Sequence, residues 1–125
     1  MLYFLVFFSF SAFSQETIED LSNKADSLYK AKDYKASLEL YNKLLALKPN
    51  HSYYLSRKGL CYFKLDDYQK AKENFRLSAL YEDPNDKEAL ATNYSNLSAC
   101  YSSLEEDKKA YEYALKAFYM DENNP

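Results

Sequence analysis

The side chains that could perform nucleophilic or acid–base chemistry are few in this sequence and lie far apart. A serine or cysteine nucleophile needs a positioned base, which is usually histidine. The one histidine, His51, follows Asn50 where we expect a turn between two helices. We interpret His51 as a solvated turn residue, and we expect no catalytic residues and no enzymatic activity.

The small number of cysteines and glycines argues against a disulfide framework, a zinc site and a phosphate-binding loop. Cys61 and Cys100 are too few for a disulfide framework and lack the spacing of a zinc site, so we expect two small buried helix residues. A loop that cradles phosphate needs several glycines, and the chain has only Gly59. No cofactor and no metal are therefore expected.

Composition and charge set the fold class. A chain of 125 residues has room for one modest domain, and its one Gly and three Pro indicate helices joined by short turns. We predict an all-α fold. The net charge is −3 with both signs interspersed, so no basic face is offered to a phosphate backbone and nucleic-acid binding is not expected.

The first residues read as an export signal. Residues 2–13 form an uncharged apolar run, and the small residues Ala12 and Ser14 suit a cleavage site, although no Lys or Arg precedes the run. The run is too short to span a bilayer, which needs about 20 apolar residues. We predict a signal peptide at 1–14, a domain at 15–125, and a periplasmic or extracellular location; the protein is cytoplasmic if the run is not a signal.

The rest of the chain contains an internal repeat. Asp33 and Tyr34 recur 34 residues later as Asp67 and Tyr68, and each copy stands between two segments of helical period. A period of this length marks a helical hairpin that buries its apolar face by stacking on its neighbours. We expect repeats at about 18–51, 52–85 and 86–124. In the third, Ala110 follows Ala71 by 39 residues, so we expect five added residues to lengthen the helix after Asp86 by about a turn and a half.

The lone glycine occupies a repeat position that is always small. Its equivalents are Ala25 and Ser98, so each hairpin places a small residue where its two helices would approach closely. We predict that Gly59→Leu overpacks the second hairpin by about 1–3 kcal/mol.

These patterns resemble the tetratricopeptide repeat, in which small, aromatic and Ala positions recur at set intervals. The first copy has Leu21, Ala25, Leu28, Tyr34, Ser37, Tyr41, Leu44 and Pro49. The second has Leu55, Gly59, Tyr62, Tyr68, Ala71, Phe75, Ser78 and a late Pro84. The third has Tyr94, Ser98, Tyr101, Ala110, Ala114 and Ala117, with Asp107 in place of the turn tyrosine.

The resemblance implies stacked antiparallel helix hairpins in a right-handed α-solenoid, whose first helices line a concave groove that binds peptides or protein segments. The groove residues that it implies as partner-binding are Tyr29, Lys30, Tyr53, Arg57, Leu60, Phe63, Lys64, Asn96 and Ser103. Aromatic residues with interleaved cations suit an acidic and apolar segment. An equal alternative is that Tyr29, Tyr53 and Phe63 pack between neighbouring repeats.

One subtype of the family clamps the carboxylate end of chaperone tails with Lys, Asn and Arg. Ser22 and Asp26 stand where that clamp needs Lys and Asn, so a chaperone-tail receptor is not expected. We expect instead an exported, non-catalytic protein-interaction module. The alternative is the N-terminal sensory or regulatory segment of a membrane-bound signalling protein such as a histidine kinase. In either case we expect continuation or oligomerisation at the last helix, where no capping helix covers Tyr111, Leu115 and Phe118.

Overall fold

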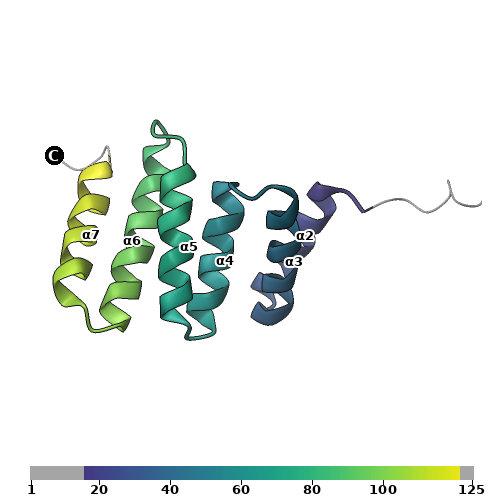
Figure 1. Cartoon of the computed structure of the whole chain (residues 1–125), viewed down its shortest axis with the longest axis horizontal. Coiled ribbons are helices and arrows are strands. Elements are labelled where there is room, and N and C mark those ends of the chain that lie inside the picture. Colours follow the sequence, from purple (N-terminus) through teal and green to yellow (C-terminus); the bar gives the residue numbers. More distant parts are fainter. Residues whose placement is uncertain (1–15, 122–125) are drawn as a thin grey trace, which may run out of the picture.

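The computed structural model describes residues 16–121, which form helices without any strand (Figure 1). The expected all-α fold is confirmed for this part of the chain, whereas the expected signal peptide lies outside the described residues. The helices are α2 (Ile18–Lys30), α3 (Tyr34–Leu47), α4 (Ser52–Lys64), α5 (Tyr68–Tyr81), α6 (Lys87–Ser103) and α7 (Asp107–Met120).

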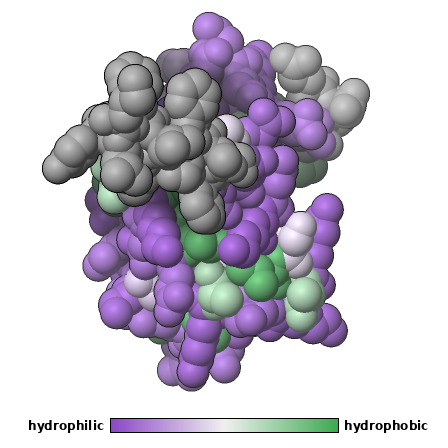
Figure 2. All heavy atoms as spheres, turned by 90° about the vertical axis from the view of Figure 1, so that its right-hand side faces the viewer, coloured by the Kyte–Doolittle hydropathy of each residue, from purple (hydrophilic) through white to green (hydrophobic). Residues whose placement is uncertain are grey.

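The helices pair as hairpins that stack in one row. Each helix packs chiefly on the one before it and the one after it, so α2 and α7 lie at opposite ends of the molecule (Figure 1). Figure 2 looks onto the end formed by α2 and α3, where apolar side chains gather in a strip among polar ones. Partly buried leucines of these two helices lie against the first core cluster: Leu21, Leu28, Leu38 and Leu45.

Short polar side chains begin most of the helices. Thr17 and Asp20 form a reciprocal capping box at α2, with N–H to oxygen distances of 3.0 and 3.1 Å. Asp33, Asp67 and Asp86 accept a backbone N–H three residues later at α3, α5 and α6. The expected caps at Asp33 and Asp86 are therefore present, while Glu106 leaves α7 without a side-chain cap.

The turn inside each hairpin has one and the same backbone form. Lys32, Asp66 and Glu105 have φ values of 64°, 62° and 61°, in the left-handed region. The next residue then donates its N–H back to a carbonyl five positions earlier, at 2.8–2.9 Å, which closes the end of the first helix. The same turn therefore forms in all three hairpins with a different residue at its left-handed position.

The small repeat position sets the distance between paired helices. Gly59 is buried, and a Cβ atom there would lie 2.8 Å from Cε1 of Phe75, closer than carbon atoms pack. The predicted close approach at Gly59 is thus confirmed. In the third hairpin the residues equivalent to Gly59 and Phe75 are Ser98 and Ala114, and Ala114 is exposed.

The five added residues of the third unit are divided between a helix and a loop. Helix α6 has 17 residues where α2 and α4 have 13, so it gains four, or about one turn. The fifth lies in the α5–α6 connection, which is one residue longer than that between α3 and α4. The expected lengthening of the helix is therefore present and shorter than predicted.

Candidate functional site

The first helices of the hairpins, α2, α4 and α6, form the face on which we expected a groove. Between α4 and α6 this face holds a hollow of about 430 Å3, which we call the groove hollow. Its lining is contributed by both helices and by the connection that precedes α6: Ser52, Tyr53, Ser56, Arg57, Leu60, Glu82, Asp86, Glu88, Ala89, Thr92 and Asn93.

A polar cluster fixes the α2–α4 side of this face. Arg57 donates from Nε to Oδ1 of Asp26 at 3.1 Å, and the Tyr53 hydroxyl donates to Oδ2 at 2.9 Å. The hydroxyl of Tyr41, from α3, also donates to Asp26. The guanidinium carbon of Arg57 lies 4.4 Å from the ring centre of Tyr29, within cation–π range. We call these five residues the Asp26 cluster.

The cluster keeps its phenols protonated and its charges balanced. Burial, and then the hydrogen bond to Asp26, raises the pKa of both Tyr41 and Tyr53 above the ordinary tyrosine range. Both hydroxyls therefore remain donors at physiological pH. The carboxylate of Asp26 receives three donors and balances the charge of Arg57, so the cluster is a fixed wall and carries no net charge.

The structure brings together only some of the residues that the sequence indicated. Tyr53, Arg57 and Leu60 line the groove hollow. The ring of Tyr29 contacts Arg57 and, at 5.3 Å between ring centres, Tyr34. Phe63 packs edge-on against Tyr68 at 5.2 Å. The contact of Tyr29 with Arg57 joins neighbouring repeats, whereas the contact of Phe63 with Tyr68 lies within one hairpin.

The remaining expected residues lie elsewhere. Lys30, Lys64 and Ser103 are exposed in the last turns of α2, α4 and α6. Asn96 lines a different hollow, between α6 and α7. The sequence did place Asp26 on the same face as Arg57, which is the signal from which their ion pair could have been inferred.

Carboxylates and a buried amide line the groove hollow and were missed in the sequence analysis. Glu82, Asp86 and Glu88 come from the end of α5 and the start of α6. Asn93 is 3% exposed, and its Nδ2 donates to Oγ of Ser78 at 2.9 Å. Ser78 in turn donates to the carbonyl of Ser52 at 2.8 Å, so one chain of hydrogen bonds joins α6, α5 and α4.

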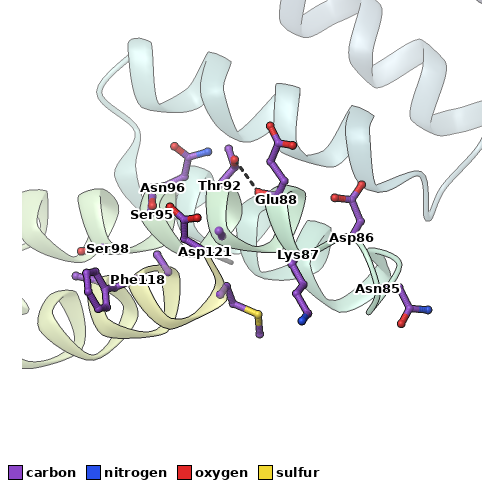
Figure 3. A pocket seen from close by; sticks show the side chains of 14 residues that line it. Asn85, Asp86, Lys87, Glu88, Thr92, Ser95, Asn96, Ser98, Phe118 and Asp121 are labelled. Atoms are coloured by element: carbon purple, nitrogen blue, oxygen red, sulfur yellow. Dashed lines mark hydrogen bonds between the residues drawn. The ribbon is translucent and has the colours of Figure 1, made fainter. Parts of the chain in front are cut away.

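A larger hollow of about 1060 Å3 lies at the α6–α7 end (Figure 3). Ser98 and Ala114 line it, where the two earlier hairpins place a small residue against Tyr41 or Phe75. Phe118 borders it and is 48% exposed. Because Ala114 stands where the other hairpins have an aromatic ring, the space of that ring forms part of the α6–α7 hollow.

His51 packs at the start of α4, and the two cysteines are buried within the fold. His51 begins α4, and its ring stacks on that of Tyr54 with centres 3.8 Å apart, while Nδ1 faces the Tyr54 N–H at 3.5 Å. Both cysteines are buried and unpaired with each other, as expected. Within residues 16–121, no group of His, Cys, Asp and Glu side chains could hold a metal ion, and no helix has the length and apolar character that a membrane crossing requires.

Comparison with known proteins finds a family that matches most of the chain. Sequence profiles of the tetratricopeptide repeat match residues 18–51, 52–86 and 91–124. Among solved structures, the first repeat domain of Spaghetti (RPAP3), bound to the HSP90 peptide SRMEEVD, has a TM-score of 0.76 at 17% identity, with 89% of this chain and 84% of that chain covered.

Two further solved structures share the fold. The type III secretion translocator chaperone SycD of Yersinia enterocolitica has a TM-score of 0.76 at 20% identity, with 90% of this chain and 80% of that chain covered. PcrH, in complex with the chaperone-binding region of PopB, has a TM-score of 0.74 at 20% identity, with coverage of 87% and 84%. At these identities the likeness establishes a common fold.

Proposed function

Because the chain belongs to the tetratricopeptide repeat family, we propose that it is a non-catalytic interaction module that binds an extended peptide, or such a segment of a partner protein, on the face of α2, α4 and α6. The family is in general a protein-interaction fold without catalysis. Proteins of the same fold are known in complexes with a peptide and with a segment of another protein.

The observation that carries the proposal is the groove hollow beside the Asp26 cluster. The hollow, of about 430 Å3, is within the size range of ligand sites, about 300–1,000 Å3. Its walls combine an aromatic ring, an aliphatic side chain and polar groups, in Tyr53, Leu60 and Thr92. Since Asp26 fixes Tyr53 and Arg57 before any ligand arrives, binding there costs little side-chain ordering.

The test is a selection of peptides from a random display library against the purified protein. Thr92 is exposed in the groove hollow, so Thr92→Tyr fills the site with a neutral ring. Asn42 is exposed on α3, outside the groove hollow, so Asn42→Tyr adds the same ring elsewhere. Selected peptides should bind Thr92→Tyr at least about tenfold more weakly, a loss of about 1.4 kcal/mol, and should bind Asn42→Tyr as they bind the unaltered protein.

Two outcomes would contradict the proposal. One is a set of selected peptides whose affinity is equal for the unaltered protein and for Thr92→Tyr. The other is equal weakening by Thr92→Tyr and Asn42→Tyr while both variants keep the melting temperature of the parent.

A further inference from the structure

The groove hollow carries a concentration of negative charge that its surroundings leave unbalanced. Glu82, Asp86 and Glu88 line it, and none of the three forms an ion pair with another residue of the described chain. Asp86 uses Oδ1 to accept the N–H of Ala89 at 3.0 Å, which caps one of the first amides of α6.

Two basic side chains lie beside these carboxylates, in the hollow or in the sequence, and both are directed elsewhere. Arg57 lines the same hollow but is paired with Asp26 at 3.1 Å, on the α2 side. Lys87 follows Asp86 in the sequence, yet Figure 3 shows its side chain extending away from those of Asp86 and Glu88. The charge that remains at the hollow is negative, opposite to the charge that the sequence analysis had assigned to the groove.

A second, independent observation is a buried amide in the wall of the hollow. Asn93 lines it and is 3% exposed, and its Oδ1 atom is buried without a hydrogen-bond partner among the described residues. The orientation of this amide is fixed by its neighbours, because the single hydroxyl hydrogen of Ser78 is donated to Ser52. Ser78 can then only accept from Asn93, so Nδ2 faces Ser78 and Oδ1 is the acceptor that needs a donor.

We propose that the groove hollow binds a cationic side chain, lysine or arginine, of a peptide ligand, with Oδ1 of Asn93 and the carboxylates of Glu82, Asp86 and Glu88 as its acceptors. The inference rests on the proposed peptide-binding function and names the ligand chemistry of that site. A buried acceptor left unsatisfied costs about 1–3 kcal/mol, and a hydrogen bond to a charged donor recovers more than one to a neutral donor.

The remaining lining suits the stem of such a side chain. Leu60 and Ala89 present carbon atoms to the hollow from α4 and α6. Long basic side chains bury their methylene groups along apolar surface while the charged end reaches polar groups. A neutral apolar side chain would fill the same space but would leave Asn93 Oδ1 without a donor and the three carboxylates without a counter-charge.

The direct probe is N-acetyl-lysine methylamide, titrated into the isotope-labelled protein and followed by NMR. Its control is N-acetyl-norleucine methylamide, which has the same stem without the ammonium group. We expect the lysine probe to shift the side-chain amide signals of Asn93 and the backbone signals of Ala89 and Thr92 in a saturable way. The norleucine probe should bind at least about tenfold more weakly, as the loss of a charged hydrogen bond requires.

A matched pair of variants tests the carboxylates. Glu82→Gln, Asp86→Asn and Glu88→Gln together remove three charges and keep the shape of the hollow, and asparagine at position 86 still caps α6. Glu39→Gln, Glu73→Gln and Glu112→Gln remove the same charge from exposed sites on α3, α5 and α7, outside the groove hollow. We expect the first set to raise the dissociation constant of the lysine probe about tenfold or more, and the second to change it by less than about twofold.

The proposal is overturned if the lysine and norleucine probes bind equally, or if both variant sets weaken lysine binding equally. It is also overturned if about 50 mM lysine probe shifts none of these signals, because a ligand with a dissociation constant of about 10 mM would then be mostly bound. Its failure is distinct from that of the proposed function. Groove-dependent peptides that lack Lys and Arg would sustain peptide binding and refute the cationic site.

Discussion

The contact between Gly59 and Phe75 shows how one absent side chain sets the distance between two helices. Phe75 is fully buried, so its ring has little room to move away from an added Cβ atom. Alanine at position 59 would gain about 1 kcal/mol of helix propensity over glycine, but overpacking costs about 1–3 kcal/mol. The glycine is therefore retained for packing, as the repeat pattern predicted.

A first prediction follows for this pair. Gly59→Leu should lower the free energy of unfolding by about 1–3 kcal/mol in urea denaturation. The double variant with Phe75→Ala gives the added leucine the space of the removed ring, so its loss should be smaller than the sum of the two single losses by at least about 1 kcal/mol. Strictly additive losses would show that residue 59 does not press on the ring.

A second prediction concerns the buried thiol of Cys100. Burial raises the pKa of this thiol to about 12, so the folded protein keeps it protonated at a pH where the unfolded chain, with a thiol pKa of about 8.5, releases the proton. The stability that this group contributes is therefore complete below about pH 8.5 and declines as the pH rises towards 12.

Urea denaturation at pH 7 and pH 10.5 measures this decline. The unaltered protein should lose more stability between the two pH values than Cys100→Ala does, although the alanine variant starts lower because of its cavity. Buried tyrosines titrate in the same direction in both proteins and cancel in the comparison. Equal losses in the two proteins would mean that the thiol ionises freely in the folded state.

Among the helices, α7 differs from its counterparts at the capping residue that precedes it. Asp33 and Asp67 precede α3 and α5 and accept the N–H of the third residue of each helix at 3.3 and 3.2 Å. Glu106 holds the same repeat position before α7 and makes no such bond. Its longer side chain instead lies 3.9 Å from Lys109, an exposed pair that contributes little.

Restoring the repeat residue should therefore stabilise α7. We predict that Glu106→Asp raises the free energy of unfolding by about 0.5–1 kcal/mol, the usual worth of a helix cap. Glu105→Asp is the matched control, because it makes the same chemical change one residue earlier, in the turn where the second hairpin already has Asp66. Urea denaturation measures both variants, and equal effects would argue against capping.

For the molecule as a whole, a row of helices that contact mainly their neighbours implies stability that varies along the row. In such arrays the outer units open with less free energy than the inner ones. Helix α7 buries only Ala110 and Ala117, while α5 buries Ala71, Asn74, Phe75 and Ser78.

We accordingly predict that backbone amides of α7 exchange with solvent faster than those of α4 and α5 in native-state hydrogen exchange, read by mass spectrometry. Ala114→Phe places in the α6–α7 hollow the ring that the other hairpins have at this position. It should slow exchange in α7 and so reduce the difference in exchange rate between α7 and the inner helices. Uniform protection over all these helices would show that the molecule opens as one unit.

The repeat spacing predicted features that lie within one hairpin better than contacts between hairpins. Spacing identified the hairpins, the caps at Asp33 and Asp86 and the close approach at Gly59, because each of these lies within a single repeat. Side-chain pairing across repeats is less accessible, since Arg57 meets Asp26 from a helix 31 positions away. The acidic residues of the groove hollow were missed because Glu82 and Asp86 lie in the connection before α6, outside the first helices on which the groove was expected. The inserted residues also shift the third unit out of phase.

The three left-handed turn residues give the molecule one point in each hairpin for attaching a spectroscopic label. Lys32, Asp66 and Glu105 are exposed and lie in turns along the same edge of the row, one hairpin apart (Figure 1). Cysteine introduced at any two of them would be open to a fluorophore or spin label, whereas Cys61 and Cys100 are buried and would be left unlabelled. The distance between two such labels would report whether the curvature of the row differs with and without an added peptide.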